Sequence, residues 1–436
     1  MTIAAGVATV FLAVVMCFGA LACSRTTRPK TQAIHPIHGL NFSPYLAGQD
    51  PAGTVLGEEQ VRSRLAICAQ YCRWVRTFGC TGGLEVVPAL AHAMNLRVAA
   101  GAWLGSDEAS NQREIAALIS AAQQGTVDIA IVGSETLLRN DLSLGSLLEY
   151  IEQVRAAIAD SIPITSVQLW RDWARSPSLV SACDVLMMND YPYWDGVSID
   201  CAIASLDHHY RIIVALAGGK PVLLSETGWP SCGNTVGLAV PSPENAARYF
   251  GQFVRWTAGY AISAFYFEAF DEAWKIRDEG PQGACWGLWD QDGVLKSGAS
   301  VVFGGHLPSA VSTGGVINGP GTPVLAIMHL PTRGSQDNLE GRVEHVDPLD
   351  YEVAVYIYVN GWWTKPYWAN PTTDVQCDGR WTCDITTGGN DSQATRIAAF
   401  LLPDGYDPPL AYGDAALSSD LAAHAVASVE VTRSAQ

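Results

Sequence analysis

Basic residues are scarce in this chain, which has 26 Lys and Arg against 43 Asp and Glu and a formal net charge of −17. This excess of negative charge disfavours polyanionic partners, so we expect neither a nucleic acid nor an anionic lipid surface to bind the folded part. The same charge is compatible with a neutral substrate. Charged residues make up only 16% of the chain and hydrophobic residues 48%, a composition typical of folded globular proteins and not of disordered ones.

Motifs that hold metals or nucleotides are also missing. No CxxC pair and no Cys/His cluster has the spacing of a zinc site. No glycine-rich phosphate loop follows the first expected strand, where residues 40–45 read LNFSPY. We therefore expect no metal site and no cofactor.

An apolar run over residues 3–23 is about long enough to span a bilayer. Residues 20–23 read ALAC and resemble a bacterial lipoprotein cleavage box, in which Cys23 would carry the lipid. Basic residues follow the run at positions 25, 28 and 30, and the positive-inside rule alone would place the body of the chain in the cytoplasm. Because the apolar run and the cleavage box argue for export, we nevertheless interpret residues 1–36 as a signal peptide, lipoprotein or membrane anchor with a linker. We expect an exported protein that is attached to the cell envelope or secreted.

Nine cysteines follow Cys23, so at least one of them is unpaired if the rest form disulfides. Two pairings are conceivable from their positions. Cys377 and Cys383 flank a short turn and would staple a hairpin. Cys232 and Cys285 lie in loops after two different expected strands and would join across the mouth of a cleft.

Strand-like and helix-like segments alternate over residues 37–306. The expected strands are 38–42, 73–78, 96–103, 128–132, 162–169, 184–188, 221–224 and 262–267. Eight strands with helices between them favour the α/β class, as a (β/α)8 TIM barrel, over a doubly wound open sheet.

A second pattern begins after a Gly/Ser/Pro-rich linker at residues 307–323. Residues 351–359 alternate like a half-buried strand, and further short strand-like runs follow. We expect residues 324–436 to form a small all-β, sandwich-like accessory domain. Four aromatic residues between 362 and 368 suit either a carbohydrate-binding face or a plug of the sandwich core, and the sequence leaves both readings open.

Two glutamates stand at the ends of expected barrel strands. Glu135 follows the fourth strand and Glu226 the seventh. Catalytic residues of such barrels lie at the carboxyl ends of the strands, where these two tips face one another. Retaining glycosidases hold two carboxyls about 5–5.5 Å apart, one as acid/base and one as nucleophile. Trp229 beside Glu226 offers a flat apolar face of the kind on which sugar rings stack.

Five motifs make residues 38–297 resemble glycoside hydrolase family 17, the β-1,3-glucanases and related glucanosyltransferases. They are VGSE at 132–135, NDYPY at 189–193, SETGWPS at 225–231, FDEAWK at 270–275 and the GLWD tail from 287 to Lys296. The resemblance implies Glu135 as the general acid/base and Glu226 as the nucleophile. The usual Gly-Asn-Glu of the family reads Gly-Ser-Glu here, with Ser134 in place of the asparagine.

Sugar-binding residues are expected around this pair, from the strand tips and from the resemblance. They are Asn41, Tyr45, Ser134, Asn189, Tyr191, Tyr193, Trp229, Glu268, Glu272, Lys275 and Glu279. For Glu272 and Lys275 the alternative is a surface ion pair of little energetic weight. For four further tryptophans, packing is as good an interpretation as substrate contact: Trp103, Trp170, Trp286 and Trp289.

The resulting hypothesis is a retaining glycoside hydrolase that cleaves laminarin-like β-1,3-glucan. A β-1,3-glucanosyltransferase with the same two glutamates is one alternative, and a non-catalytic glucan-binding surface protein is another. The expected partner is a β-glucan polysaccharide or oligosaccharide, with membrane contact only through the N-terminal anchor.

Overall fold

The computed structural model describes residues 37–309 and 314–434. The expected signal peptide, lipoprotein box and anchor fall outside these residues. Within them, no helix combines the length and apolar character that crossing a membrane requires. The boundaries that the sequence indicates between linker and domains stay predictions.

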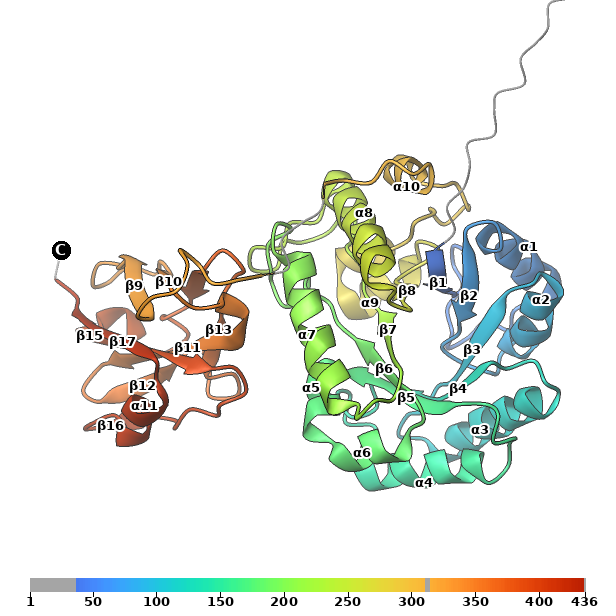
Figure 1. Ribbon diagram of the computed structural model, residues 1–436, viewed down its shortest axis with the longest axis horizontal. Coiled ribbons are helices and arrows are strands. Elements are labelled where there is room, and N and C mark those ends of the chain that lie inside the picture. Colours follow the sequence, from blue (N-terminus) through green and yellow to red (C-terminus); the bar gives the residue numbers. More distant parts are fainter. Residues whose placement is uncertain (1–36, 310–313, 435–436) are drawn as a thin grey trace, which may run out of the picture. The chain divides into compact units, whose positions relative to one another are not determined.

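Eight parallel strands form the first sheet, and they coincide with the eight runs expected from the sequence (Figure 1). They are β1 Ile37–Asn41, β2 Cys72–Arg76, β3 Arg97–Ala102, β4 Ile129–Ser134, β5 Ile164–Leu169, β6 Leu186–Asn189, β7 Val222–Glu226 and β8 Phe265–Tyr266. From β1 to β7 each strand pairs with the next in the chain, and β8 pairs with β1. A parallel bridge between Leu224 and Ala264 joins β7 to the entry of β8 and closes the ring. The predicted (β/α)8 barrel is confirmed.

Helices cover the outside of this barrel, between consecutive strands (Figure 1). They are α1 Glu58–Cys68, α2 Val87–Ala93, α3 Glu108–Gln123, α4 Leu144–Arg155, α5 Trp170–Arg175, α6 Pro177–Ala182, α7 Ala202–Leu216 and α8 Pro243–Tyr260. Two short helices, α9 Ile276–Glu279 and α10 Ser297–Phe303, follow β8. Local chemistry sets their starts: at α8, the Ser242 hydroxyl accepts a hydrogen bond from the Asn245 amide, and Pro243 occupies the first turn.

Two antiparallel sheets make up the C-terminal module, so the predicted sandwich-like class is confirmed. One has the strand order β14-β10-β9, and the other β16-β12-β11-β15-β17, with β13 pairing β11. The strands are β9 Val324–His329, β10 Leu339–Glu344, β11 Tyr351–Tyr358, β12 Trp362–Lys365, β13 Thr372–Asp374, β14 Arg380–Cys383, β15 Arg396–Pro403, β16 Tyr412–Asp414 and β17 Ala427–Thr432. A short helix, α11 Ser419–His424, precedes β17.

Two disulfides are present in the described residues. Cys232 pairs with Cys285, as their loop positions indicated. The expected hairpin staple is wrong, because Cys377 pairs with Cys201 at the start of α7, while Cys383 is a buried free thiol. The Cys201–Cys377 bond spans 176 residues and links the barrel covalently to the C-terminal module.

Candidate active site

Glu135 directly follows β4 and lies in an unusual turn at the end of that strand. Gly133 has φ 74° and Glu135 has φ 52°, and the β4–β5 register shifts between Ile131 and Ser134. A side chain at such a left-handed position is uncommon and is held there by its surroundings. The Glu135 amide donates to the Val167 carbonyl at 2.7 Å, and its Oε1 accepts from Asn189 Nδ2 at 2.8 Å.

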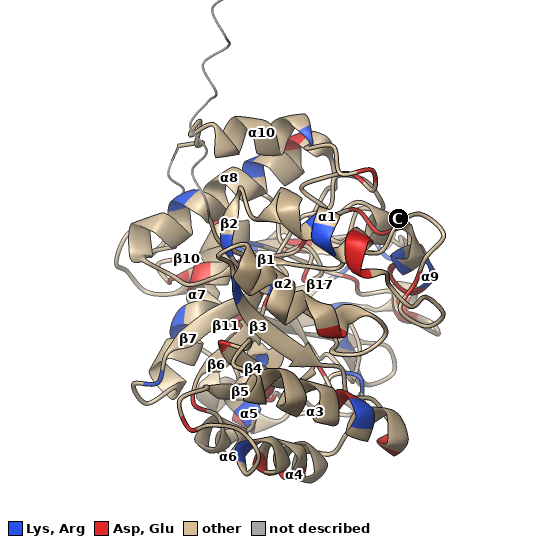
Figure 2. Cartoon of the chain, turned by 90° about the vertical axis from the view of Figure 1, so that its right-hand side faces the viewer, with Lys and Arg blue, Asp and Glu red and all other residues tan. Residues whose placement is uncertain are grey.

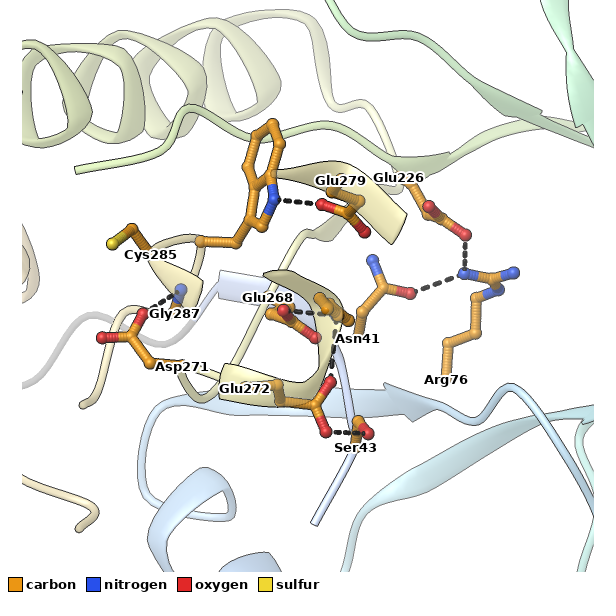
Figure 3. A network of polar contacts seen from close by, with 12 residues as sticks. Asn41, Ser43, Arg76, Glu226, Glu268, Asp271, Glu272, Glu279, Cys285 and Gly287 are labelled. Atoms are coloured by element: carbon orange, nitrogen blue, oxygen red, sulfur yellow. Dashed lines mark hydrogen bonds and ion pairs between the residues drawn. The ribbon is translucent and has the colours of Figure 1, made fainter. Parts of the chain in front are cut away.

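Glu226, at the end of β7, is held by two donors, and Figure 3 shows the contact of one of them, Arg76. Arg76 Nη1 lies 2.5 Å from its Oε1, and the Tyr191 hydroxyl donates to its Oε2 at 2.6 Å. Arg76 is fully buried and Glu226 is 6% exposed. The buried guanidinium and the phenol hydroxyl together hold both carboxylate oxygens in a fixed orientation.

The Arg76 guanidinium also connects neighbouring strand tips. It donates to Asn41 Oδ1 at 2.8 Å and to Ser134 Oγ at 2.9 Å, while Asn41 Nδ2 donates to the Ser225 carbonyl at 3.0 Å. Sequence reasoning did not single out Arg76. The available signal was an arginine at the carboxyl end of a barrel strand, a position where a buried unpaired charge is costly.

The two glutamates have different electrostatic surroundings. Burial raises the pKa of Glu135 to about 7, the negative charge of Glu226 adds to this rise, and the hydrogen bond from Asn189 opposes it. Glu226 has a cationic partner within 2.5 Å, whereas Glu135 has none at that range. Glu135 is therefore suited to hold a proton near neutral pH, whereas Glu226 is paired with a buried guanidinium.

Lys275 forms a buried cluster with two acids beside this pair. Its Nζ lies 2.5 Å from Glu268 Oε1 and 2.9 Å from Glu272 Oε2, and Ser43 Oγ donates to Glu272 Oε1 at 2.5 Å (Figure 3). Burial lowers the pKa of Lys275, but the charges of Glu268 and Glu272 outweigh it and the pKa is raised. All three residues are at most 5% exposed. The alternative of a weak surface ion pair is therefore wrong.

A cleft of about 910 Å³ opens over the glutamates. Besides both of them, it is lined by six of the residues expected to bind sugar: Tyr45, Ser134, Tyr191, Glu272, Lys275 and Glu279. Three others act from behind the lining through hydrogen bonds or an ion pair: Asn41, Asn189 and Glu268. The charges on the outer helices are scattered, with basic residues standing singly among acidic ones (Figure 2).

Trp229 and Tyr193 lie elsewhere than expected. Trp229 is 1% exposed, its indole donates to the Val240 carbonyl at 3.1 Å, and its ring packs against Tyr193 with centroids 5.6 Å apart. Tyr193 is fully buried and donates its hydroxyl to the Asn234 carbonyl. Neither lines the cleft, so the expected sugar wall at Trp229 is corrected to a packing position behind it.

Other tryptophans supply the cleft's aromatic surface. Trp103 is 44% exposed under the Arg139 guanidinium, and Trp194, which sequence reasoning missed, is 39% exposed. Trp286 lines the cleft and donates to Glu279 Oε2 at 2.7 Å. Trp170 lines it as well, whereas Trp289 is buried among other aromatic rings.

Within the described residues, one trio has a geometry compatible with a metal ion: Asp190, Asp195 and His209. These groups already have partners. His209 Nδ1 lies 2.9 Å from Asp190 Oδ2, and Arg171 lies 3.5 Å from Asp195 Oδ1. The positive guanidinium disfavours a cation there. His209 also stacks on Trp170, with the ring centroids 4.1 Å apart, so its imidazole packs against an aromatic ring.

Comparison with known proteins matches this barrel to one enzyme class. The BtgE/BtgC glycoside hydrolase domain matches residues 39–287. The glucan 1,3-β-glucosidase BGL2 of Candida albicans is 31% identical over 230 residues, which cover 47% of this chain and 74% of that protein. The glucan 1,3-β-glucosidase of Schizosaccharomyces pombe is 30% identical over 246 residues, 51% of this chain and 75% of its own.

A solved structure agrees. The family 17 β-1,3-glucanosyltransferase of Rhizomucor miehei is similar with a TM-score of 0.54 and 31% identity, over 60% of this chain and 96% of that one. The barrel is thus a glycoside hydrolase fold with a two-carboxylate site. The chain belongs to the BtgE/BtgC glycoside hydrolase family, as its resemblance to family 17 indicated, and it is a glycosidase. The family match ends before the C-terminal sheets begin.

Proposed function

We propose that this glycosidase cleaves β-1,3-glucan with retention of configuration, with Glu226 as nucleophile and Glu135 as general acid/base. The observation that carries the proposal is the contrast between the two carboxyls: Arg76 pairs with Glu226, whereas burial raises the pKa of Glu135 to about 7. The substrate class follows from the relatives, which are named glucan 1,3-β-glucosidases, and from the Rhizomucor miehei enzyme, of which an active-site mutant is described in complex with laminaritriose.

In the first step, the Glu226 carboxylate attacks the anomeric carbon while Glu135 gives its proton to the departing glycosidic oxygen. A covalent glycosyl-enzyme ester forms and the shortened glucan leaves. The esterified Glu226 has lost its negative charge, which removes one of the causes that raise the pKa of Glu135. Glu135 is then the stronger acid and its carboxylate is available as a base.

In the second step, Glu135 takes a proton from a water molecule as the oxygen attacks the anomeric carbon, and Glu226 leaves as a carboxylate. Two inversions give net retention. Tyr191 and Arg76 stabilise the departing carboxylate through the contacts they make with it in the free site. Of the residues lining the cleft, Tyr45, Glu272 and Glu279 are the proposed contacts to the sugar hydroxyls.

The pH dependence of the free enzyme tests the role of Glu135. Because Glu135 must carry its proton into the first step, kcat/KM should fall above pH about 7, close to tenfold per pH unit. Asn189→Ala removes a hydrogen bond that lowers the pKa of Glu135, so the basic limb should move to higher pH. The measurement is kcat/KM on a laminari-oligosaccharide between about pH 5 and about pH 9 for both proteins.

Asn245→Ala is the matched control, since Asn245 lies on α8 and bonds the Val240 carbonyl. It should leave the basic limb in place. A profile that stays flat to pH about 9 in the parent enzyme would refute the assignment of Glu135 as the acid.

Transfer is the second candidate function, favoured by the 31% identity to the Rhizomucor miehei glucanosyltransferase. It uses the same glycosyl-enzyme, with a sugar hydroxyl in place of water as acceptor. Following laminari-oligosaccharide products over time separates the two. Shorter products alone support hydrolysis, and products longer than the substrate would require transfer. A parallel assay on β-1,3-, β-1,4- and mixed-linkage glucans tests the substrate class, which fails if the β-1,3-glucan is untouched.

We also propose that the chain works outside the cytoplasm, tethered through Cys23. The support is the lipoprotein-like box at residues 20–23 together with the Cys201–Cys377 and Cys232–Cys285 disulfides, because such bonds persist in oxidising compartments. Cys23→Ser should release the protein from the membrane fraction of expressing bacteria, as measured by fractionation and immunoblotting. Equal membrane retention of Cys23→Ser and parent would contradict the lipid tether.

A further inference from the structure

Two half-exposed aromatic rings stack on each other on the C-terminal module. Trp368 is 50% exposed and Tyr412 is 58% exposed, and their ring centroids lie 5.2 Å apart with 29° between the planes. A core plug would bury these rings, and the buried aromatic of this segment is instead Trp362, which is 3% exposed. Hydrophobic residues of this size usually stay exposed in a group only where a partner covers them.

The backbone holds this ring pair in place. Trp363 on β12 pairs in register with Tyr412 on β16, and the Trp368 indole donates to the Ala411 carbonyl at 3.3 Å. Gly413 lies against the Trp363 ring so closely that an added Cβ would approach within 2.9 Å of it. The Trp368–Tyr412 pair therefore rests on a packed layer and its rings have little freedom left to lose on binding.

The charged residues in and beside the segments that carry the two rings limit which molecules can bind there. The segments that carry the rings, residues 366–373 and 408–413, contain no Lys, Arg, Asp or Glu, and next to them the Asp414 carboxylate accepts from the Tyr412 amide at 2.8 Å. A flat aromatic surface with a carboxylate beside it and no basic residue in these segments offers nothing to a phosphate. It is complementary to the apolar C–H face of a neutral pyranose ring, while exposed backbone and Asn370 remain available for hydroxyls.

We propose that Trp368 and Tyr412 form a binding platform for neutral β-glucan chains, separate from the catalytic cleft. This inference rests on the proposed function only for the identity of the glucan. The platform lies outside residues 39–287, over which the family matches, so it is a property of the accessory module. Because the Cys201–Cys377 disulfide ties the module to the barrel, a polysaccharide held there raises the local concentration of substrate near the same molecule's cleft.

The test uses the full chain in a Glu226→Ala background, so that the polysaccharide is not consumed. Partition onto insoluble linear β-1,3-glucan is measured for this parent and for added Trp368→Ala, Tyr412→Ala and Trp368→Phe substitutions. Removing either ring should weaken partition about tenfold, whereas Trp368→Phe keeps an aromatic face and should lose less. Tyr260→Ala on α8 is the control, because Tyr260 is similarly exposed, at 54%, but lies on the barrel.

Each outcome has a distinct meaning. Partition of Trp368→Ala equal to that of the parent, with unchanged melting temperature, overturns the platform. The platform is also overturned if Trp368→Ala changes self-association in sedimentation but leaves glucan partition unchanged. The rings would then contact a second copy of the chain. Cleavage of soluble laminari-oligosaccharides by the otherwise native enzyme carrying Trp368→Ala should stay normal. If the enzyme without any substitution does not cleave these oligosaccharides, that result contradicts the proposed function and not the platform.

Discussion

Glu226→Ala should lower glucan hydrolysis roughly 10⁴-fold or more, because without this carboxylate no glycosyl-enzyme can form. Glucan binding should persist, since the side chains that line the cleft remain. The variant should also fold, although Arg76 loses one acceptor, because that guanidinium keeps its bonds to Asn41 and Ser134. Release of reducing ends gives the rate, and calorimetric titration with a laminari-oligosaccharide gives the affinity.

Glu152→Ala is the matched control, since Glu152 is an exposed residue on α4 that does not line the cleft. It should retain full turnover. Unchanged release of reducing sugar by Glu226→Ala would remove Glu226 from the nucleophile's role. A fall in turnover together with retained binding also excludes the alternative of a non-catalytic glucan-binding protein.

Arg76→Met should be the most destabilising of these single substitutions. It leaves the buried Glu226 carboxylate without its cation and deprives Asn41 and Ser134 of their shared donor. Breaking one side of a buried ion pair costs about 3–5 kcal/mol. The free energy of unfolding from denaturant titration should fall by about that amount, and turnover should fall with it, because the nucleophile loses its orientation.

A double variant separates the charge effect from the loss of packing. In Arg76→Met/Glu226→Gln no unpaired charge remains, so part of the lost stability should return while turnover stays absent. Arg113→Met, on the exposed face of α3, controls for loss of an arginine as such. The 2.5 Å contact between Arg76 and Glu226 does not stabilise the fold as proposed if Arg76→Met is as stable as the parent. The same conclusion follows if the double variant is less stable than the single one.

The barrel was predictable because most of its strands are short, largely apolar runs that are buried, as parallel barrel strands are. Position within that pattern also predicted Glu135 and Glu226 at the strand tips. The register shift in β4 and the left-handed turn that present Glu135 were not predictable, because neither glycine content nor hydrophobicity specifies which residue takes φ 52°.

Contacts between residues distant in the sequence explain the remaining errors. Trp229 looked like a sugar wall because it follows Glu226, but the chain after it turns back and Val240 accepts the indole hydrogen bond. Arg76 was missed because its acceptors lie 35 to 150 residues away. The Cys201–Cys377 bond was missed for the same reason, since short spacing favoured a local hairpin staple that the fold does not form.

Trapping the covalent glycosyl-enzyme intermediate tests directly whether Glu226 is the nucleophile. A 2-deoxy-2-fluoro laminaribiosyl fluoride slows both steps but keeps a reactive leaving group, so the glycosyl-enzyme should accumulate. Mass spectrometry of the digested protein should place one laminaribiosyl unit on the peptide that contains Glu226, and the unit should be absent in Glu226→Ala. Labelling of Glu135, or turnover of the reagent to a product of inverted configuration without any label, would contradict the account.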